Sequence, residues 1–113
     1  MPSDEIQLSV LRLLEKTPQV TQRQMSAELG VSLGKTHYVV KSLIEVGLIK
    51  LDNFQRSDNK LGYAYLLTPK GIKEKAAITV RFLARKQDEY RRLELEIEAL
   101  KSEVEGRASS GAR

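Results

Sequence analysis

Two helix-start signals and two glycine stops follow one another in a short segment, and this segment restricts the fold more than any other. Thr21 and Gln24 form a T-x-x-Q capping box, which predicts the start of one helix, and Gly30 predicts its end. Ser32 is placed to cap a second helix, which is expected to stop at Gly47. Two helices joined by a turn of a few residues around a glycine are typical of a helix-turn-helix.

The second of these helices, expected over residues 33–46, has one apolar face. The residues at helical spacing on that face are Thr36, Val39, Val40 and Leu43. If the domain binds DNA, the N-terminal half of the opposite face would enter a major groove, because a packed first helix holds the second at a fixed angle. The candidate DNA contacts are Ser32, Leu33, Gly34, Lys35, His37, Tyr38 and Lys41.

These residue types suit contact with DNA, although several could equally be packing residues or exposed polar residues without a DNA contact. Lys35 can donate to guanine O6 or N7, or to a phosphate. His37 could donate to a base or a phosphate, or be a simple exposed polar residue. Gly34 would allow close approach of the backbone to DNA, or be a tolerated small residue. Tyr38 could bind a phosphate or support the helix, and Leu33 could touch a thymine methyl or pack.

A helix expected from Asp4 to Lys16, capped by Ser3, precedes this pair. Its apolar face is expected to consist of Ile6, Val10, Leu13 and Leu14. Leu8 and Leu11 lie off that face. They suggest a second contact surface, against another part of the chain or against another subunit.

After Gly47 the hydrophobic period changes from helical to strand-like. Residues 48–51 and 63–67 predict two strands, and residues 52–62 between them are rich in turn-forming types. The sequence therefore predicts a β-hairpin with a long polar tip, called the wing here. Arg56 and Lys60 in the wing are candidate contacts to phosphates or to the minor groove.

A long last helix is expected from Pro69 to residue 105, with Thr68 as its cap. Gly71 falls in its first turn, where a glycine costs little, and Gly106 is expected to end it. Lysines near its start could add phosphate contacts or form a solvated face; they are Lys70, Lys73 and Lys75. The tail over residues 106–113 is small and polar and is expected to be disordered.

The distal part of this helix carries a coiled-coil-like seam. Leu93, Ile97, Leu100 and Val104 are spaced 4, 3 and 4 residues apart. Tyr90 extends the seam backwards, and Lys86 interrupts it. An isolated amphipathic helix is marginal in water, so we expect these residues to hold a homodimer together.

Charge and composition point to a nucleic-acid partner rather than to catalysis. The net charge is +4, and residues 31–92 carry thirteen basic and six acidic side chains, while both flanking segments are net acidic. There is no cysteine and one histidine, so no metal site or cofactor is expected. No hydrolase, phosphate-loop or metalloprotease motif is present, so no enzyme is predicted. With no signal peptide and no long apolar run, a cytoplasmic protein without membrane contact is expected.

These features predict a mainly α fold with a small β-hairpin. A winged helix-turn-helix domain over residues 1–68 would be followed by a long dimerisation helix over residues 69–105. The predicted function is sequence-specific binding of double-stranded DNA by a homodimeric transcriptional regulator. The helix expected over residues 33–46 contains no arginine, which keeps an alternative open. In this alternative the protein is an interaction adaptor whose winged helix and long helix dock onto transcription machinery.

Several runs of residues also resemble MarR-type winged-helix regulators, most of all the small subgroup associated with extracellular polysaccharide genes in bacteria. The distinctive runs are Ser32-Leu33-Gly34-Lys35 and Tyr65-Leu66-Leu67-Thr68-Pro69-Lys70-Gly71, within a resemblance that spans most of residues 5–100. It implies a bacterial transcriptional regulator that acts as a homodimer on exopolysaccharide genes. The chain lacks the additional terminal helices of larger MarR proteins, so its last helix is expected to supply the dimer interface. No particular small-molecule effector is implied.

Overall fold

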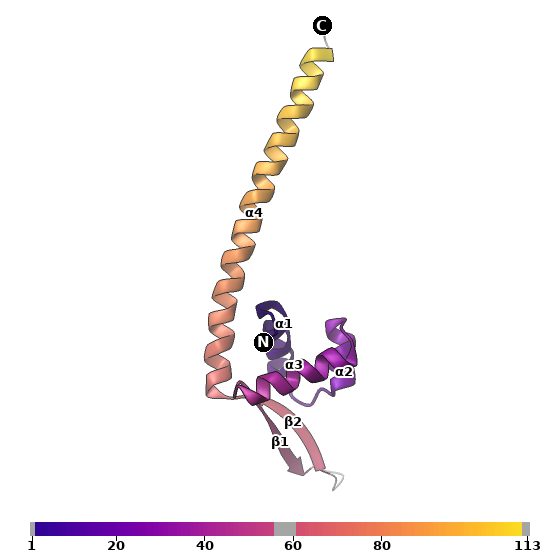
Figure 1. Ribbon diagram of the computed structural model, residues 1–113, viewed down its shortest axis with the longest axis vertical. Helices are drawn as coiled ribbons and strands as arrows, with labels where there is room; N and C mark the ends of the chain where they lie inside the picture. The colour runs from indigo at the N-terminus through magenta and orange to yellow at the C-terminus, as the bar shows by residue number, and fades with distance from the viewer. Residues whose placement is uncertain (1, 56–60, 112–113) are drawn as a thin grey trace. The chain divides into compact units, whose positions relative to one another are not determined.

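The computed structural model describes residues 2–55 and 61–111 (Figure 1). It is mainly helical with one antiparallel hairpin, as predicted. The elements are α1 (Asp4–Lys16), α2 (Gln22–Leu29), α3 (Leu33–Glu45), β1 (Ile49–Gln55), β2 (Leu61–Leu67) and α4 (Pro69–Gly111). The chain divides into two compact units, Met1–Val80 and Arg81–Arg113.

Helix α1 is the centre of the first unit. The Ser3 hydroxyl caps it by accepting from the Ile6 N–H at 3.4 Å. Leu8 and Leu11 are only 2% and 0% exposed, so they belong to the core of this chain and not to a contact with another subunit. The buried face is shifted from the predicted one, since Gln7, Leu8 and Leu11 are buried with Val10 and Leu14, whereas Ile6 and Leu13 are half-buried. The shift arises because α1 is covered by α2, α3 and β2 together.

The caps of α2 and α3 form as the sequence predicts. Thr21 Oγ1 accepts from the Gln24 N–H at 3.1 Å, and Gln24 Oε1 accepts from the Thr21 N–H at 2.9 Å. Ser32 Oγ accepts from the Lys35 N–H at 3.0 Å. Gly30 and Gly47 have φ of 67° and 79°, the left-handed conformation that favours glycine after a helix.

The hairpin is longer than predicted. The strands pair from Ile49 opposite Leu67 as far as Gln55 opposite Leu61. Backbone pairing continues through the polar residues Asp52 and Asn53, because the ladder uses N–H and C=O groups and not side chains. In Figure 1 the hairpin projects from the helices of the first unit. The Tyr65 N–H donates to the Pro18 carbonyl at 2.9 Å, which ties β2 to the α1–α2 turn.

The start of α4 is fastened to the turn between α3 and β1. The Thr68 hydroxyl donates to the Gly47 carbonyl and accepts from the Gly71 N–H at 3.0 Å. Lys70 Nζ donates to the Val46 carbonyl at 2.8 Å. A Cβ on Gly71 would lie 1.9 Å from the Leu48 carbonyl oxygen. Gly71 is therefore required by this close approach, and not merely tolerated in a first turn as the sequence suggested.

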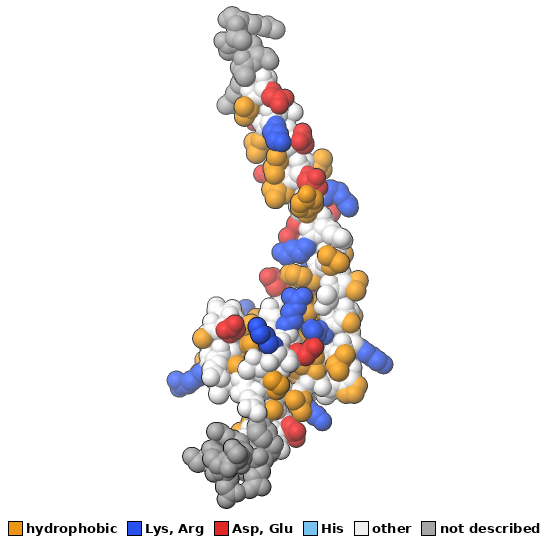
Figure 2. Space-filling view, turned by 180° about the vertical axis from the view of Figure 1, so that it is seen from behind, with side chains coloured by type: hydrophobic (Ala, Val, Ile, Leu, Met, Phe, Trp, Pro, Cys, Tyr) orange, Lys and Arg blue, Asp and Glu red, His pale blue; other side chains and the backbone are white. Residues whose placement is uncertain are grey.

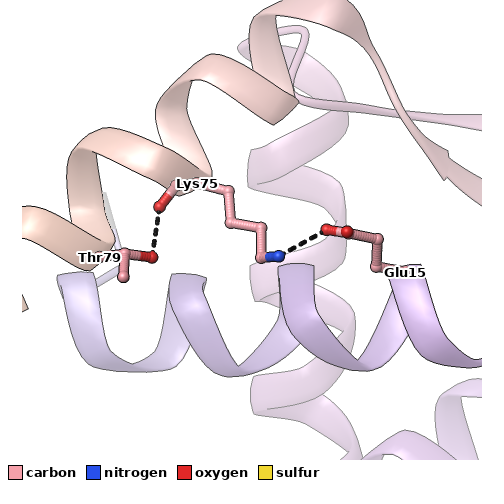
Figure 3. Close-up of polar contacts among 3 residues, drawn as sticks. All are labelled: Glu15, Lys75 and Thr79. Carbon is pink, nitrogen blue, oxygen red and sulfur yellow. Dashed lines mark hydrogen bonds and ion pairs between the residues drawn. The ribbon is translucent and has the colours of Figure 1, made fainter.

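The first turns of α4 belong to the first unit. Ile78 is fully buried, and Lys75 Nζ lies 2.7 Å from the Glu15 carboxylate at the end of α1 (Figure 3). In the same view the Thr79 hydroxyl donates to the Lys75 carbonyl one turn back, at 2.7 Å. The boundary between the two units thus lies inside α4, after Val80.

Beyond Val80, α4 continues to Gly111 and passes through Gly106, which was expected to end it. A glycine lowers helix stability by about 1 kcal/mol but keeps its N–H and C=O, so it does not interrupt the hydrogen bonds. Exposed ion pairs one turn apart line this part, including Arg92 with Asp88 at 2.9 Å. Among the helices described, none combines the length and apolar character needed to cross a membrane.

Candidate nucleic-acid interface

The two faces of α3 have opposite character. Thr36, Val39, Val40 and Leu43 are buried, as their spacing predicted. The sequence-predicted contact residues all lie on the exposed side; they are Ser32, Leu33, Gly34, Lys35, His37, Tyr38 and Lys41. The Ser32 side chain is already engaged in capping the helix. The others present cationic, aromatic and apolar groups outward from one rigid element.

A groove runs between the N-terminal ends of α2 and α3. Its lining residues are Thr21, Gln22 and Arg23 from α2, with Leu33, Gly34 and His37 from α3. The fold thus brings three of the predicted residues together with an arginine that sequence reasoning missed. The signal that could have found Arg23 is its place in the first turn of α2, directly after the Thr21 cap.

A second groove separates α3 from the hairpin. His37, Val40, Lys41, Ile44 and Glu45 of α3 face Leu51 of β1 and Tyr65 of β2 across it, with Gln22 at its edge. Lys41 therefore lies beside the wing, whereas Lys35 and Tyr38 line neither groove.

His37 is hydrogen-bonded to Gln22 of α2, and Gln22 in turn links it to Tyr65 of β2. Its Nδ1 lies 3.3 Å from Gln22 Oε1, and Gln22 Nε2 donates to the Tyr65 hydroxyl at 3.3 Å. Sequence reasoning did not find Gln22 or Tyr65. No local pattern connects them, because they are 43 residues apart and meet only through the tie between β2 and Pro18.

The remaining predicted DNA contacts lie outside these two grooves or outside the described residues. Lys70 and Lys75 are used inside the first unit, by the Val46 carbonyl and the Glu15 carboxylate. Arg56 and Lys60 lie outside the described residues. Within residues 2–55 and 61–111, no group of three or more His, Asp or Glu side chains is arranged to hold a metal ion.

Substitution of Gly34 is expected to change protein stability and DNA affinity in opposite directions. The φ of Gly34 is ordinary for a helix, and a Cβ built on it meets nothing within 4 Å. Gly34→Ala should therefore stabilise the protein slightly through helix propensity alone, by less than about 1 kcal/mol because Gly34 lies in the first turn. If the backbone approaches DNA here, the same methyl group should lower DNA affinity by about ten-fold or more. Thermal unfolding and fluorescence anisotropy with DNA measure the two effects; unchanged affinity would rule out a close approach at Gly34.

The comparisons with known proteins agree with this architecture. A family model described as winged helix-turn-helix DNA-binding matches residues 3–50. The PcaV transcriptional regulator of Streptomyces coelicolor has a similar fold, with a TM-score of 0.63 and 23% identity over 94% of this chain and 76% of that one. A mutant of MepR from a multidrug-resistant S. aureus clinical isolate gives 0.56 and 22%, over 97% and 78%.

A third similar structure is Staphylococcus aureus MarR in complex with salicylate and kanamycin, with a TM-score of 0.57 and 22% identity over 76% of this chain. This chain spans 56% of the length of that one. No curated protein matches the chain at a significant level. Fold and comparisons together define the first unit as a winged helix-turn-helix domain of the kind found in MarR-type proteins.

Proposed function

We propose that this protein is a sequence-specific DNA-binding transcriptional regulator that acts as a homodimer. The observation that carries the proposal is the exposed face of α3, which presents Lys35, His37 and Lys41 opposite a fully buried face. A helix held in this way, with its N-terminal half exposed and cationic, fits a DNA major groove. The wing, with Arg56 and Lys60, would then lie against phosphates or in the minor groove.

Arg23 strengthens this proposal over the adaptor alternative. Arginine is the commonest reader of guanine, and its absence from α3 was the main reason to consider an adaptor. Arg23 is exposed at the start of α2 and lines the same groove as Gly34 and His37. It supplies a guanidinium where a base edge or a phosphate would lie.

The second unit supports the homodimer. Its seam residues are exposed in the single chain, with values of 64% for Tyr90, 52% for Leu93, 42% for Ile97, 55% for Leu100 and 66% for Val104. Figure 2 shows apolar side chains gathered along this part of α4. A second copy pairing along the a/d seam would cover them. Two-fold symmetry would place two copies of α3 on half-sites about 34–36 Å apart.

The resemblance of the Ser32–Lys35 run to regulators associated with polysaccharide genes directs the search for target genes. Promoters of extracellular polysaccharide genes are the first candidates after the DNA upstream of the protein's own gene. Binding to either in a gel-shift assay would support the proposal. Equal affinity for all DNA, or none, would contradict sequence-specific regulation.

Lys35→Ala and Lys41→Ala should each weaken binding to that DNA, because each removes a cation from the exposed face of α3. For a phosphate contact, the slope of log affinity against log salt should fall by about 1 per substitution. Lys16→Ala, which removes the same charge from α1, is the control and should change little. If both α3 variants keep the wild-type affinity and salt slope, α3 is not the DNA-reading helix.

A further inference from the structure

Three side chains from three elements form a chain of hydrogen bonds at the candidate interface. His37 of α3 bonds to Gln22 of α2 through Nδ1 and Oε1, and Gln22 Nε2 donates to the hydroxyl of Tyr65 in β2. His37 is exposed, whereas Gln22 and Tyr65 are half-buried behind it. The imidazole is thus held through Nδ1, and its other nitrogen, Nε2, is left for the groove between α2 and α3.

The backbone under each member is fixed by its own contacts. Gln22 is the first residue of α2 and follows directly on the Thr21 capping box. Tyr65 is held by its N–H bond to the Pro18 carbonyl at 2.9 Å. His37 lies one turn into α3, next to Thr36, whose hydroxyl donates to the Ser32 carbonyl at 2.9 Å. The hydrogen bonds from His37 to Gln22 and from Gln22 to Tyr65 therefore join backbone positions that the fold itself fixes.

The chemistry of the amide decides where the imidazole proton lies. An amide oxygen can only accept, so the His37 nitrogen that bonds to Gln22 Oε1 must carry a proton. Neutral imidazole has one N–H, and the second nitrogen is then an acceptor. We propose that Gln22 holds His37 in the Nδ1–H form, so that Nε2 presents an acceptor that reads the exocyclic amine of adenine or cytosine. The base-reading half of this proposal rests on the proposed function.

This assignment changes the expected role of His37. In the major groove, adenine N6 and cytosine N4 are donors, whereas guanine and thymine present acceptors and a methyl group. A neutral His37 with an unprotonated Nε2 cannot donate to guanine or to a phosphate, as the sequence had suggested. It adds a hydrogen-bond acceptor beside the donors Lys35 and Lys41. His37 would therefore recognise adenine or cytosine, whereas the lysines recognise guanine.

The proton position can be measured without DNA. The chain has one histidine, so ¹⁵N NMR of the full-length protein at about pH 9, where imidazole is neutral, reports His37 alone. We expect a protonated Nδ1 and an unprotonated Nε2, the reverse of free histidine. Gln22→Met, which removes the acceptor, should shift the proton to Nε2, and Gln22→Glu, which keeps one, should preserve the wild-type spectrum.

Two results would overturn the assignment. Protonation at Nε2 in the wild type would mean that the amide of Gln22 is turned the other way, with its nitrogen toward His37. The same tautomer in the wild type and in Gln22→Met would mean that Gln22 does not set it. Far-UV circular dichroism on each variant checks that the fold is kept. The wild-type spectrum alone can still overturn the assignment if Gln22→Met unfolds.

The DNA half is tested by binding profiles over randomised sequences. His37→Ala should lower the preference for adenine or cytosine at one position by about five-fold, the size expected for one hydrogen bond. Loss of a guanine preference, or no change at any position, would refute base reading by an acceptor. If the wild type binds no DNA, the proposed function and the base-reading half both fail, while the NMR result still decides the tautomer.

Discussion

Replacement of Gly71 by alanine is expected to destabilise the first unit by about 3 kcal/mol or more, at the upper end of what overpacking does. The new Cβ would lie 1.9 Å from the Leu48 carbonyl oxygen and 2.9 Å from its carbon. These are backbone atoms, so no side chain can rotate away. Relief requires that the start of α4 move away from the α3–β1 turn, which breaks the bonds of Thr68 to Gly47 and of Lys70 to Val46.

Thermal unfolding measures this effect, and Gly34→Ala is its matched control. Both substitutions add one methyl group in the first turn of a helix, but the space at Gly34 is open. For a domain of this size, about 3 kcal/mol lowers the melting temperature by roughly 12–24 °C. A Gly71→Ala protein that melts within about two degrees of the wild type would show that α4 does not approach Leu48 as closely as the structure has it.

The double substitution Ile97→Ala and Leu100→Ala is expected to convert the proposed dimer to monomer. A dimer would lose four buried side chains, each contributing about 1.5 kcal/mol, so dimerisation should weaken about ten-thousand-fold. Alanine keeps the helix propensity of α4 high, so the effect would report the interface and not the helix. Sedimentation over a concentration series measures it, and affinity for a two-half-site DNA should fall in parallel.

Leu95→Ala is the matched control for the dimer. Leu95 is 68% exposed and lies on the helix face opposite Ile97 and Leu100 in the heptad pattern, so its truncation should leave the dimer intact. If the double variant sediments like the wild type at every concentration, the seam does not hold the copies together. Leu8 and Leu11 would not supply a substitute interface, because both are buried in the first unit.

The parts of the fold that could be predicted are those set by residues close in sequence. The Thr21–Gln24 box, the Ser32 cap and the stop at Gly47 each act over a few residues, and all three appear in the structure. The apolar spacing of α3 likewise defines its buried face. Consequently the exposed residues of α3, and with them most of the candidate interface, follow from sequence alone.

What could not be predicted depends on contacts between distant segments. The burial of Leu8 and Leu11 requires that α1 be covered from several sides, and the need for Gly71 arises only when α4 meets Leu48. Gln22 and Tyr65 meet because β2 is tied to Pro18, a pairing that no periodicity reveals. Each of these is a property of the assembled domain and not of a helix or strand alone.

The burial of Ile78 and the pairing of Lys75 with Glu15 also bear on how such proteins can be recombined. The visible joint in the chain is at Pro69, where strand gives way to helix, but an exchange made there would remove part of the first unit's own core. Exchange of the proposed dimerisation segment would leave the first unit complete only if it were made beyond Val80. The first unit therefore includes the first three turns of α4 as part of its own structure.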